Sequence, residues 1–169
     1  MLVGVHGMRI NNNFRRMAKN IGSIYRVEVD SGTVRYFWDV ATDSTQLGGA
    51  IIVLFRRSYP KDSVPDLDEI ISDDVDFYCH TMPLVGKKLG LWEKVGFRPV
   101  TRTFQMMFRA SDDIGNPAIK VSERWYIWEP SQPMRFVGKL TPEYAKIEEG
   151  AIYAPIRVVN RIRTGVYYK

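Results

Sequence analysis

The sequence predicts an α+β fold dominated by β-structure: a curved antiparallel sheet or partial barrel with two or three short helices. Three observations favour this fold class. Aromatic residues are plentiful, with four Trp, nine Tyr and eight Phe, and aromatic and β-branched residues prefer strands. Residues 23–40 alternate between apolar and polar positions on both sides of a turn signal. The six-residue apolar run 50–55 is typical of a central buried strand.

The first element expected is a β-hairpin. Residues 23–30 and 33–40 would form its strands, and the pair 31–32, Ser-Gly, its two-residue turn. A turn of this length places Tyr25 opposite Trp38 and gathers the apolar residues of both strands on one face. We therefore expect Tyr25 and Trp38 to be buried neighbours on the same side of the sheet.

Further elements follow in order along the chain. Strands are expected at 75–82, 92–99, 104–109 and 119–128, a short acidic helix at 65–71 and a helix start at Thr141, while residues 155–162 fit either a helix or a strand. No repeat or linker divides the sequence. Residues 20–169 are therefore predicted to form a single domain, preceded by a loosely attached arm, residues 1–19.

Composition predicts a cytoplasmic location and no membrane association. The single cysteine, Cys79, excludes an internal disulfide framework and is typical of a reducing compartment. No segment reaches the roughly 20 apolar residues of a membrane-spanning helix. The first residues lack the basic region that opens a secretory signal.

Charge is distributed unevenly along the chain. The net charge is +5, yet one segment holds seven acidic residues and no basic one: Asp62, Asp66, Asp68, Glu69, Asp73, Asp74 and Asp76. Outside this segment 24 basic residues stand against 12 acidic ones. Such a segment is either a solvated loop and short helix or a surface that meets a basic partner.

The sequence offers little for catalysis. Its histidines are His6 and His80, and His80 follows Cys79 in an expected strand, where adjacent side chains point to opposite faces. A Cys-His pair needs both side chains within hydrogen-bond reach, so Cys79 is read as a buried apolar residue. No nucleotide-binding loop, nucleophile elbow or metal-ligand spacing occurs. We expect no enzyme activity, no catalytic residue, no metal and no cofactor.

Three parts of the chain carry a family resemblance. They are the strand start at Gly22, the run Trp-Glu-Lys-Val-Gly-Phe-Arg-Pro at 92–99, and the close Val-Val-Asn-Arg-Ile at 158–162. With the order of elements between them, about residues 20–165 resemble the immunity protein 26 family of bacterial polymorphic-toxin systems. The resemblance implies a small cytosolic protein that neutralises a cognate toxin domain by tight stoichiometric binding.

The resemblance names no binding surface, and the charge pattern supplies a hypothesis. Many such toxins are basic nucleases, and an acidic patch speeds association with a basic partner. The acidic segment 62–76 is therefore the expected partner-binding surface. The alternative is a nucleic-acid-binding module that uses interleaved basic and aromatic residues, as at Arg157–Lys169. A weaker alternative is a hydrolase that uses acidic residues.

Overall fold

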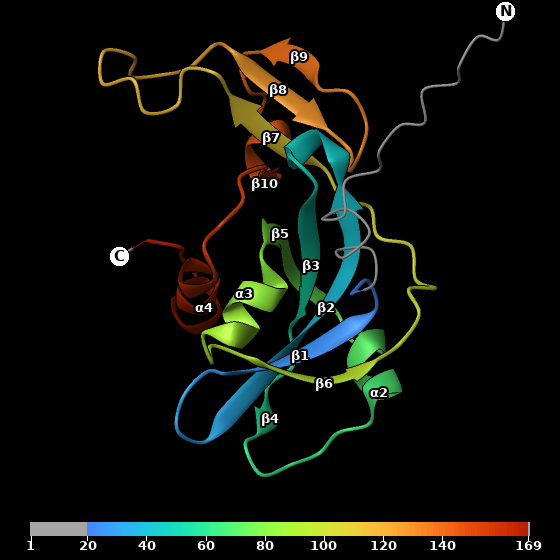
Figure 1. The fold of residues 1–169 in the computed structure, drawn as a ribbon. Helices are drawn as coiled ribbons and strands as arrows, with labels where there is room; N and C mark the ends of the chain where they lie inside the picture. Colours follow the sequence, from blue (N-terminus) through green and yellow to red (C-terminus); the bar gives the residue numbers. More distant parts are fainter. Residues whose placement is uncertain (1–19, 169) are drawn as a thin grey trace, which may run out of the picture.

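The larger part of the fold is a six-stranded antiparallel sheet (Figure 1). The computed structural model describes residues 20–168, so the predicted arm, residues 1–19, lies outside the described part. The strands are β1 (Ser23–Glu28), β2 (Thr33–Asp43), β3 (Gly49–Phe55), β4 (Tyr59–Pro60), β5 (Val75–Thr81) and β6 (Glu93–Phe97). Their order is β5-β3-β2-β1-β6, with β4 paired to the start of β2, so the sheet is open rather than a barrel.

A second, smaller sheet lies at one end of the first (Figure 1). It contains β7 (Phe108–Ser111), β8 (Trp125–Trp128), β9 (Arg135–Gly138) and β10 (Glu148–Glu149), in the order β10-β7-β8-β9. Three α-helices complete the described residues: α2 (Leu67–Ser72), α3 (Pro83–Lys88) and α4 (Pro155–Thr164). Short 3-10 helices occupy Ser44–Gln46 and Tyr144–Lys146. The predicted β-dominated α+β class is confirmed.

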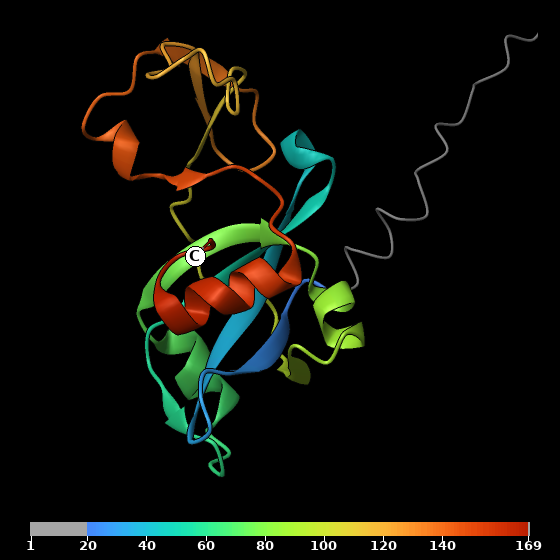
Figure 2. The ribbon, with the colours of Figure 1, turned by 90° about the vertical axis from the view of Figure 1, so that its left-hand side faces the viewer.

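Both faces of the large sheet are buried. On one face, Val158, Val159 and Ile162 of α4 pack against the strands, together with Trp92. Figure 2 shows α4 lying across the strands on this side. On the other face, Ile70 of α2 and Phe108 of β7 belong to a separate core cluster. We call these the α4 face and the α2 face.

The predicted hairpin forms, but its predicted register is wrong by one residue. Ile24 pairs with Trp38, and Tyr25 pairs with Phe37. Tyr25 therefore belongs to the core of the α4 face, whereas Trp38 belongs to the core of the α2 face. The alternation misled the prediction because it was taken to separate a buried face from a solvated one, although β2 is buried on both sides from Val34 to Val40.

The turn of the hairpin explains the shift in register. The carboxylate of Asp30 accepts hydrogen bonds from the backbone amides of Gly32 and Thr33, each at 2.8 Å. The amide of Val29 donates to the carbonyl of Thr33, which closes a three-residue loop in place of the expected two-residue turn. This is the Asx-type local bonding that lets aspartate shape turns.

Several smaller predictions can be compared with the structure. The buried strand at 50–55 and the strand at 75–82 are confirmed as β3 and β5, and the acidic helix is α2, with Asp66 as its N-cap. Residues 155–162, left open between helix and strand, begin α4. The expected strand 119–128 is wrong over its first half: β8 begins only at Trp125, and just before it the Ser122 hydroxyl accepts a hydrogen bond from the Arg124 amide, a local bond in place of strand pairing.

The two sheets are joined by the buried carboxylate of Asp43, at the end of β2. It accepts hydrogen bonds from His80 Nε2 on β5 at 2.7 Å and from Trp128 Nε1 on β8 at 3.1 Å. The backbone amides of Ser131 and Thr45 donate to its other oxygen at 2.7 and 2.9 Å. A fully buried carboxylate thus has four donors, which compensates for its loss of hydration.

Protonation of this group follows from its surroundings. Burial by itself would raise the pKa of Asp43, but the hydrogen bonds from Ser131, Trp128, His80 and Thr45 together lower it. Burial lowers the pKa of His80, and Asp43 only partly opposes that change. A neutral imidazole therefore donates its Nε2 proton to an anionic carboxylate. Both side chains are 0% exposed, so the pair resembles an acid–base dyad but is closed to substrates and serves to join the sheets.

Replacing Asp43 with Ala should destabilise the protein by about 3–5 kcal/mol, because four donors, of which those of His80 and Trp128 are buried, would lose their acceptor. Urea denaturation followed by tryptophan fluorescence measures the change. The matched control is Asp112→Ala, which removes an exposed carboxylate bonded to Arg124 in the second sheet and should change stability far less. Equal losses in the two variants would contradict the role given to Asp43.

Candidate functional site

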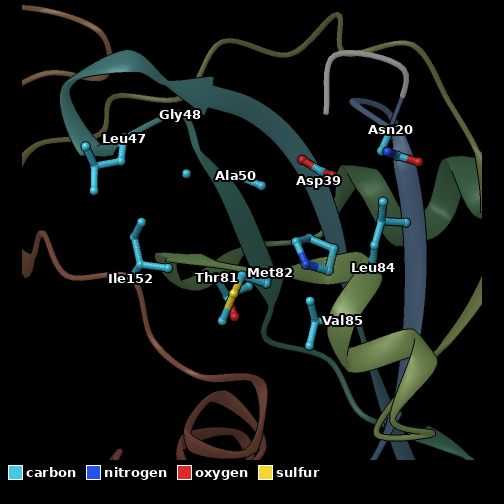
Figure 3. Close-up of a pocket in the computed structure, with 12 residues that line it drawn as sticks. Asn20, Asp39, Leu47, Gly48, Ala50, Thr81, Met82, Leu84, Val85 and Ile152 are labelled. Carbon is cyan, nitrogen blue, oxygen red and sulfur yellow. The ribbon is translucent and has the colours of Figure 1, made fainter. Parts of the chain in front are cut away.

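An apolar pocket of about 310 Å³ opens on the α4 face, between the β2–β3 connection and the start of α3 (Figure 3). Its walls are Leu47, Ala50, Met82, Leu84, Val85 and Ile152. Figure 3 shows Leu47 and Ile152 at one end of the pocket and Leu84 at the other. Most of these wall residues are also partly exposed at the rim, which makes the opening an apolar surface patch. Patches of this kind mark interaction sites.

The β2–β3 connection carries one wall of the pocket. It begins at Asp43, whose carboxylate bonds the Thr45 amide and starts the 3-10 helix 44–46. Leu47 then adopts a left-handed conformation, with φ of 51°, and its side chain is 95% exposed. A positive φ is uncommon for a residue that carries a Cβ. The connection therefore holds a large apolar side chain in solvent at the rim, at a cost in both backbone strain and hydration.

Helix α3 carries the opposite wall, and Trp92 fixes its position. The indole Nε1 of Trp92 donates to the carbonyl of Pro83 at 2.7 Å, and its ring packs edge-on against Phe37. Gly86 allows this close approach, because a Cβ at that position would lie 2.0 Å from the Trp92 ring. Leu84 and Val85, in the first turn of the helix, remain exposed at the rim of the pocket.

The lining of this apolar pocket also includes a buried acid, Asp39 on β2. Asp39 is 2% exposed, and its Oδ1 has no hydrogen-bond partner among the described residues. Burial raises the pKa of Asp39 to about 7, an effect opposed in part by Lys94 on β6. Burial, and after it the charge of Asp39, raise the pKa of Tyr25 to about 12. At neutral pH the carboxyl is therefore poised between its two protonation states.

The pocket can therefore hold a ligand, but its described lining brings together no set of side chains that could catalyse a reaction. Of the other polar side chains in its lining, Thr81 is already bonded, because its hydroxyl donates to the carbonyl of Tyr153 at 2.8 Å. Asn20 also has an interaction of its own. Within residues 20–168, no three His, Cys, Asp or Glu side chains are grouped closely enough to hold a metal ion. What the arrangement offers is an apolar hollow whose lining includes one acidic side chain, that of Asp39.

Three of the seven acids in the predicted acidic surface pair with arginines. Asp68 pairs with Arg98, Glu69 with Arg57, and Asp76 with Arg35. Two further carboxylates bond backbone amides: Asp66 that of Asp68, and Asp73 that of Arg57. Asp62 and Asp74 are exposed and make no ion pair or side-chain hydrogen bond within the described part of the chain. The seven residues therefore act mainly in local structure, with two left to face a partner.

The acidic segment and the pocket lie on different sides of the large sheet. Ile70, between these acids in α2, packs into the core of the α2 face. Asp39 lies two residues after Phe37 on β2, so both side chains point to the same face of the sheet, toward α3 and α4. Sequence reasoning missed Asp39 because it lay at a polar position of the alternating strand. The available signal was a single acid between Trp38 and Val40, in a strand that turns out to be buried on both faces.

The two residues considered for catalysis lie as predicted, on opposite faces of β5. Cys79 packs in the core of the α4 face, while the ring of His80 lies 4.1 Å from that of Phe108, in the core of the α2 face. Burial raises the pKa of the Cys79 thiol to about 12, which keeps it protonated and unreactive. His6 lies outside the described residues.

Comparison with known proteins gave no match. No protein-family model, no curated protein and no solved structure is similar to this chain. Among residues 20–168, no helix combines the length and apolar character that crossing a bilayer requires.

The Asn variant of Asp39 should be more stable than the wild type, and the difference should depend on pH. Below pH 3.8 the carboxyl is protonated in both folded and unfolded chains. As the pH rises to about 7, the unfolded chain ionises first and wild-type stability falls; above about 7 the penalty is complete. Asp39→Asn lacks this penalty, so its advantage should grow to a few kcal/mol, roughly, by pH 8.

Urea denaturation at pH 4, 6 and 8 measures this difference. The matched control is Asp62→Asn, which changes an exposed carboxylate with no partner and should shift stability little at any of the three pH values. A stability difference between Asp39→Asn and the wild type that stays constant from pH 4 to pH 8 would show that Asp39 titrates as an ordinary carboxyl group.

Proposed function

We propose that this protein is a toxin-neutralising immunity protein, which binds its cognate toxin domain one-to-one in the cytoplasm and acts without catalysis. The observation that carries the proposal is the apolar pocket with its exposed rim, in which Leu47 is exposed to solvent and the buried Asp39 has an Oδ1 that no described residue bonds. Both features cost stability in the free protein, and both are relieved when a partner covers them.

The geometry suits a protein partner. Interface energy concentrates where an anchor side chain fills a desolvated pocket that is surrounded by contacts which exclude water. The pocket supplies such a cavity, and Met82, Leu84 and Val85 supply an apolar rim. The resemblance of residues 20–165 to an immunity-protein family names the class of partner, and tight occupancy of one site is how such a protein would neutralise a toxin.

The charge distribution favours a protein partner over nucleic acid. Four of the 24 basic residues and none of the 19 acidic ones lie in residues 1–19. Residues 20–169 therefore hold 20 basic and 19 acidic residues, a net charge of +1. Nucleic-acid binding draws its affinity from many phosphate contacts, so this alternative would depend mainly on the four basic residues of the arm.

Growth rescue by a co-expressed pair tests the proposal. The toxin domain encoded beside this gene should arrest growth when expressed alone, and co-expression of the full-length protein should restore growth. Mixed in vitro, the two should form a 1:1 complex, and inhibition of the toxin should be complete at equimolar protein. Absence of protection, or complete protection at a small fraction of equimolar protein as a catalyst would give, would overturn the proposal. Binding to DNA or RNA that weakens steeply with salt, without toxin binding, would support the alternative.

In this proposal the acidic segment does not hold the toxin but speeds its association through electrostatic attraction. Reversing its two unpaired acids, in the double variant Asp62→Lys/Asp74→Lys, should slow association with a basic toxin about two- to fivefold at low salt and leave dissociation unchanged. Stopped-flow measurements at two salt concentrations provide the rates. The control is Glu123→Lys/Glu129→Lys, which makes the same change in charge on exposed residues of the second sheet region. Equal association rates in the two variants would show that the acidic segment does not accelerate association with the toxin.

A further inference from the structure

The lining of the pocket restricts what can fill it. Its walls are aliphatic over most of their length, from Leu47 and Ile152 at one end to Leu84 at the other (Figure 3). Its lining also includes Asp39, which is 2% exposed and whose Oδ1 has no hydrogen-bond partner among the described residues. A ligand that matches both features has an unbranched apolar body and a hydrogen-bond donor at its tip.

Charge complementarity selects among the donors. An anion at the tip would be repelled by ionised Asp39, and a purely apolar tip would leave the Asp39 carboxylate without a donor, which is unfavourable for a buried group. A hydroxyl group would supply one hydrogen bond. An ammonium group would supply a hydrogen bond and an opposite charge together, and charge-assisted bonds are about twice as strong as neutral ones. The best match is therefore a primary ammonium on an aliphatic stem.

We propose that the pocket is a lysine-binding site, in which a lysine side chain of the bound partner lays its methylene groups along Leu47, Val85 and Ile152 and places its ammonium against the carboxylate of Asp39. This inference rests on the proposed function, because it identifies the chemistry with which the toxin would be held. Lysine buries its stem readily while its head group keeps a polar partner.

Small ligands test the pocket apart from any toxin. The full-length protein, labelled with ¹⁵N, is titrated with n-pentylamine, 1-pentanol and pentanoate, which share the chain and differ in the head group. Pentylamine should give saturable shifts of the Ala50, Thr81 and Val85 amide signals, with at least fivefold tighter binding than pentanol. Pentanoate should give none. Pentylamine that binds no better than pentanol would overturn the proposal.

Two carboxyl variants assign the ammonium to Asp39. Asp39→Asn should weaken pentylamine binding at least tenfold and leave pentanol binding within about twofold, whereas Asp112→Asn should change neither. Equal pentylamine affinity in Asp39→Asn and wild type would overturn the assignment. If neither amine nor alcohol binds, and Asp39→Asn instead moves the amide signals of residues 1–19, the chain's own N-terminal segment occupies the pocket and the proposal is wrong.

The outcome for the toxin is separable from the outcome for the pocket. If toxin is neutralised but pentylamine does not bind, the lysine site fails and the immunity function stands. If pentylamine binds through Asp39 but no toxin is neutralised, the site stands and the function fails. If both hold, Asp39→Asn should raise the toxin off-rate at least tenfold with an unchanged on-rate, and a single Lys→Met substitution in the toxin should reproduce that loss.

Discussion

The bonding of the Asp43 carboxylate is the interaction on which the rest of the structure depends. It lies at the end of the longest strand, where the large sheet meets the small one, and it receives donors from β5, from β8 and from two loops. The same carboxylate starts the β2–β3 connection, and that connection carries Leu47 to the rim of the pocket. The packing of the two sheets and the shape of the pocket therefore both depend on the hydrogen bonds of Asp43. A change that weakens these bonds would alter both.

Asp39 lies four residues earlier on the same strand, and its buried carboxyl group is in the opposite situation from that of Asp43. Asp43 is surrounded by donors and its pKa is lowered, whereas Asp39 keeps an unpartnered oxygen and its pKa is raised to about 7. A protein under selection for stability alone would not keep the second arrangement, because an unpaired buried carboxyl weakens the folded state. Strained or unsatisfied groups persist where they serve binding. This contrast between two aspartates is the physical basis for placing the functional site at Asp39.

Patterns of single elements predicted much of the fold, while tertiary burial decided what they missed. The apolar run of β3, the N-cap Asp66 and the strand β5 follow from local chemistry, and the structure confirms them. The hairpin register failed because alternation identifies a core face only when the other face meets solvent, and here α2 and α4 cover both. The pocket was not predicted, for a related reason: its walls come from Leu47, α3 and Ile152, which are far apart in sequence and meet only in the folded chain. The seven acids were predicted as one surface because sequence does not show the arginines that pair with them, such as Arg98 and Arg35.

The central claim is that Asp39 is a buried carboxyl group, bonded by no side chain of residues 20–168, that gains a partner when a cation enters the pocket. The most direct measurement is the NMR titration of the Asp39 side-chain ¹³C carboxyl signal, recorded without ligand and with saturating pentylamine. The account predicts a midpoint near pH 7 in the free protein and a clear fall of that midpoint when the amine is bound, because the ammonium favours the ionised form. A free-protein midpoint near the ordinary value for aspartate, or a midpoint that the amine leaves unmoved, would contradict it.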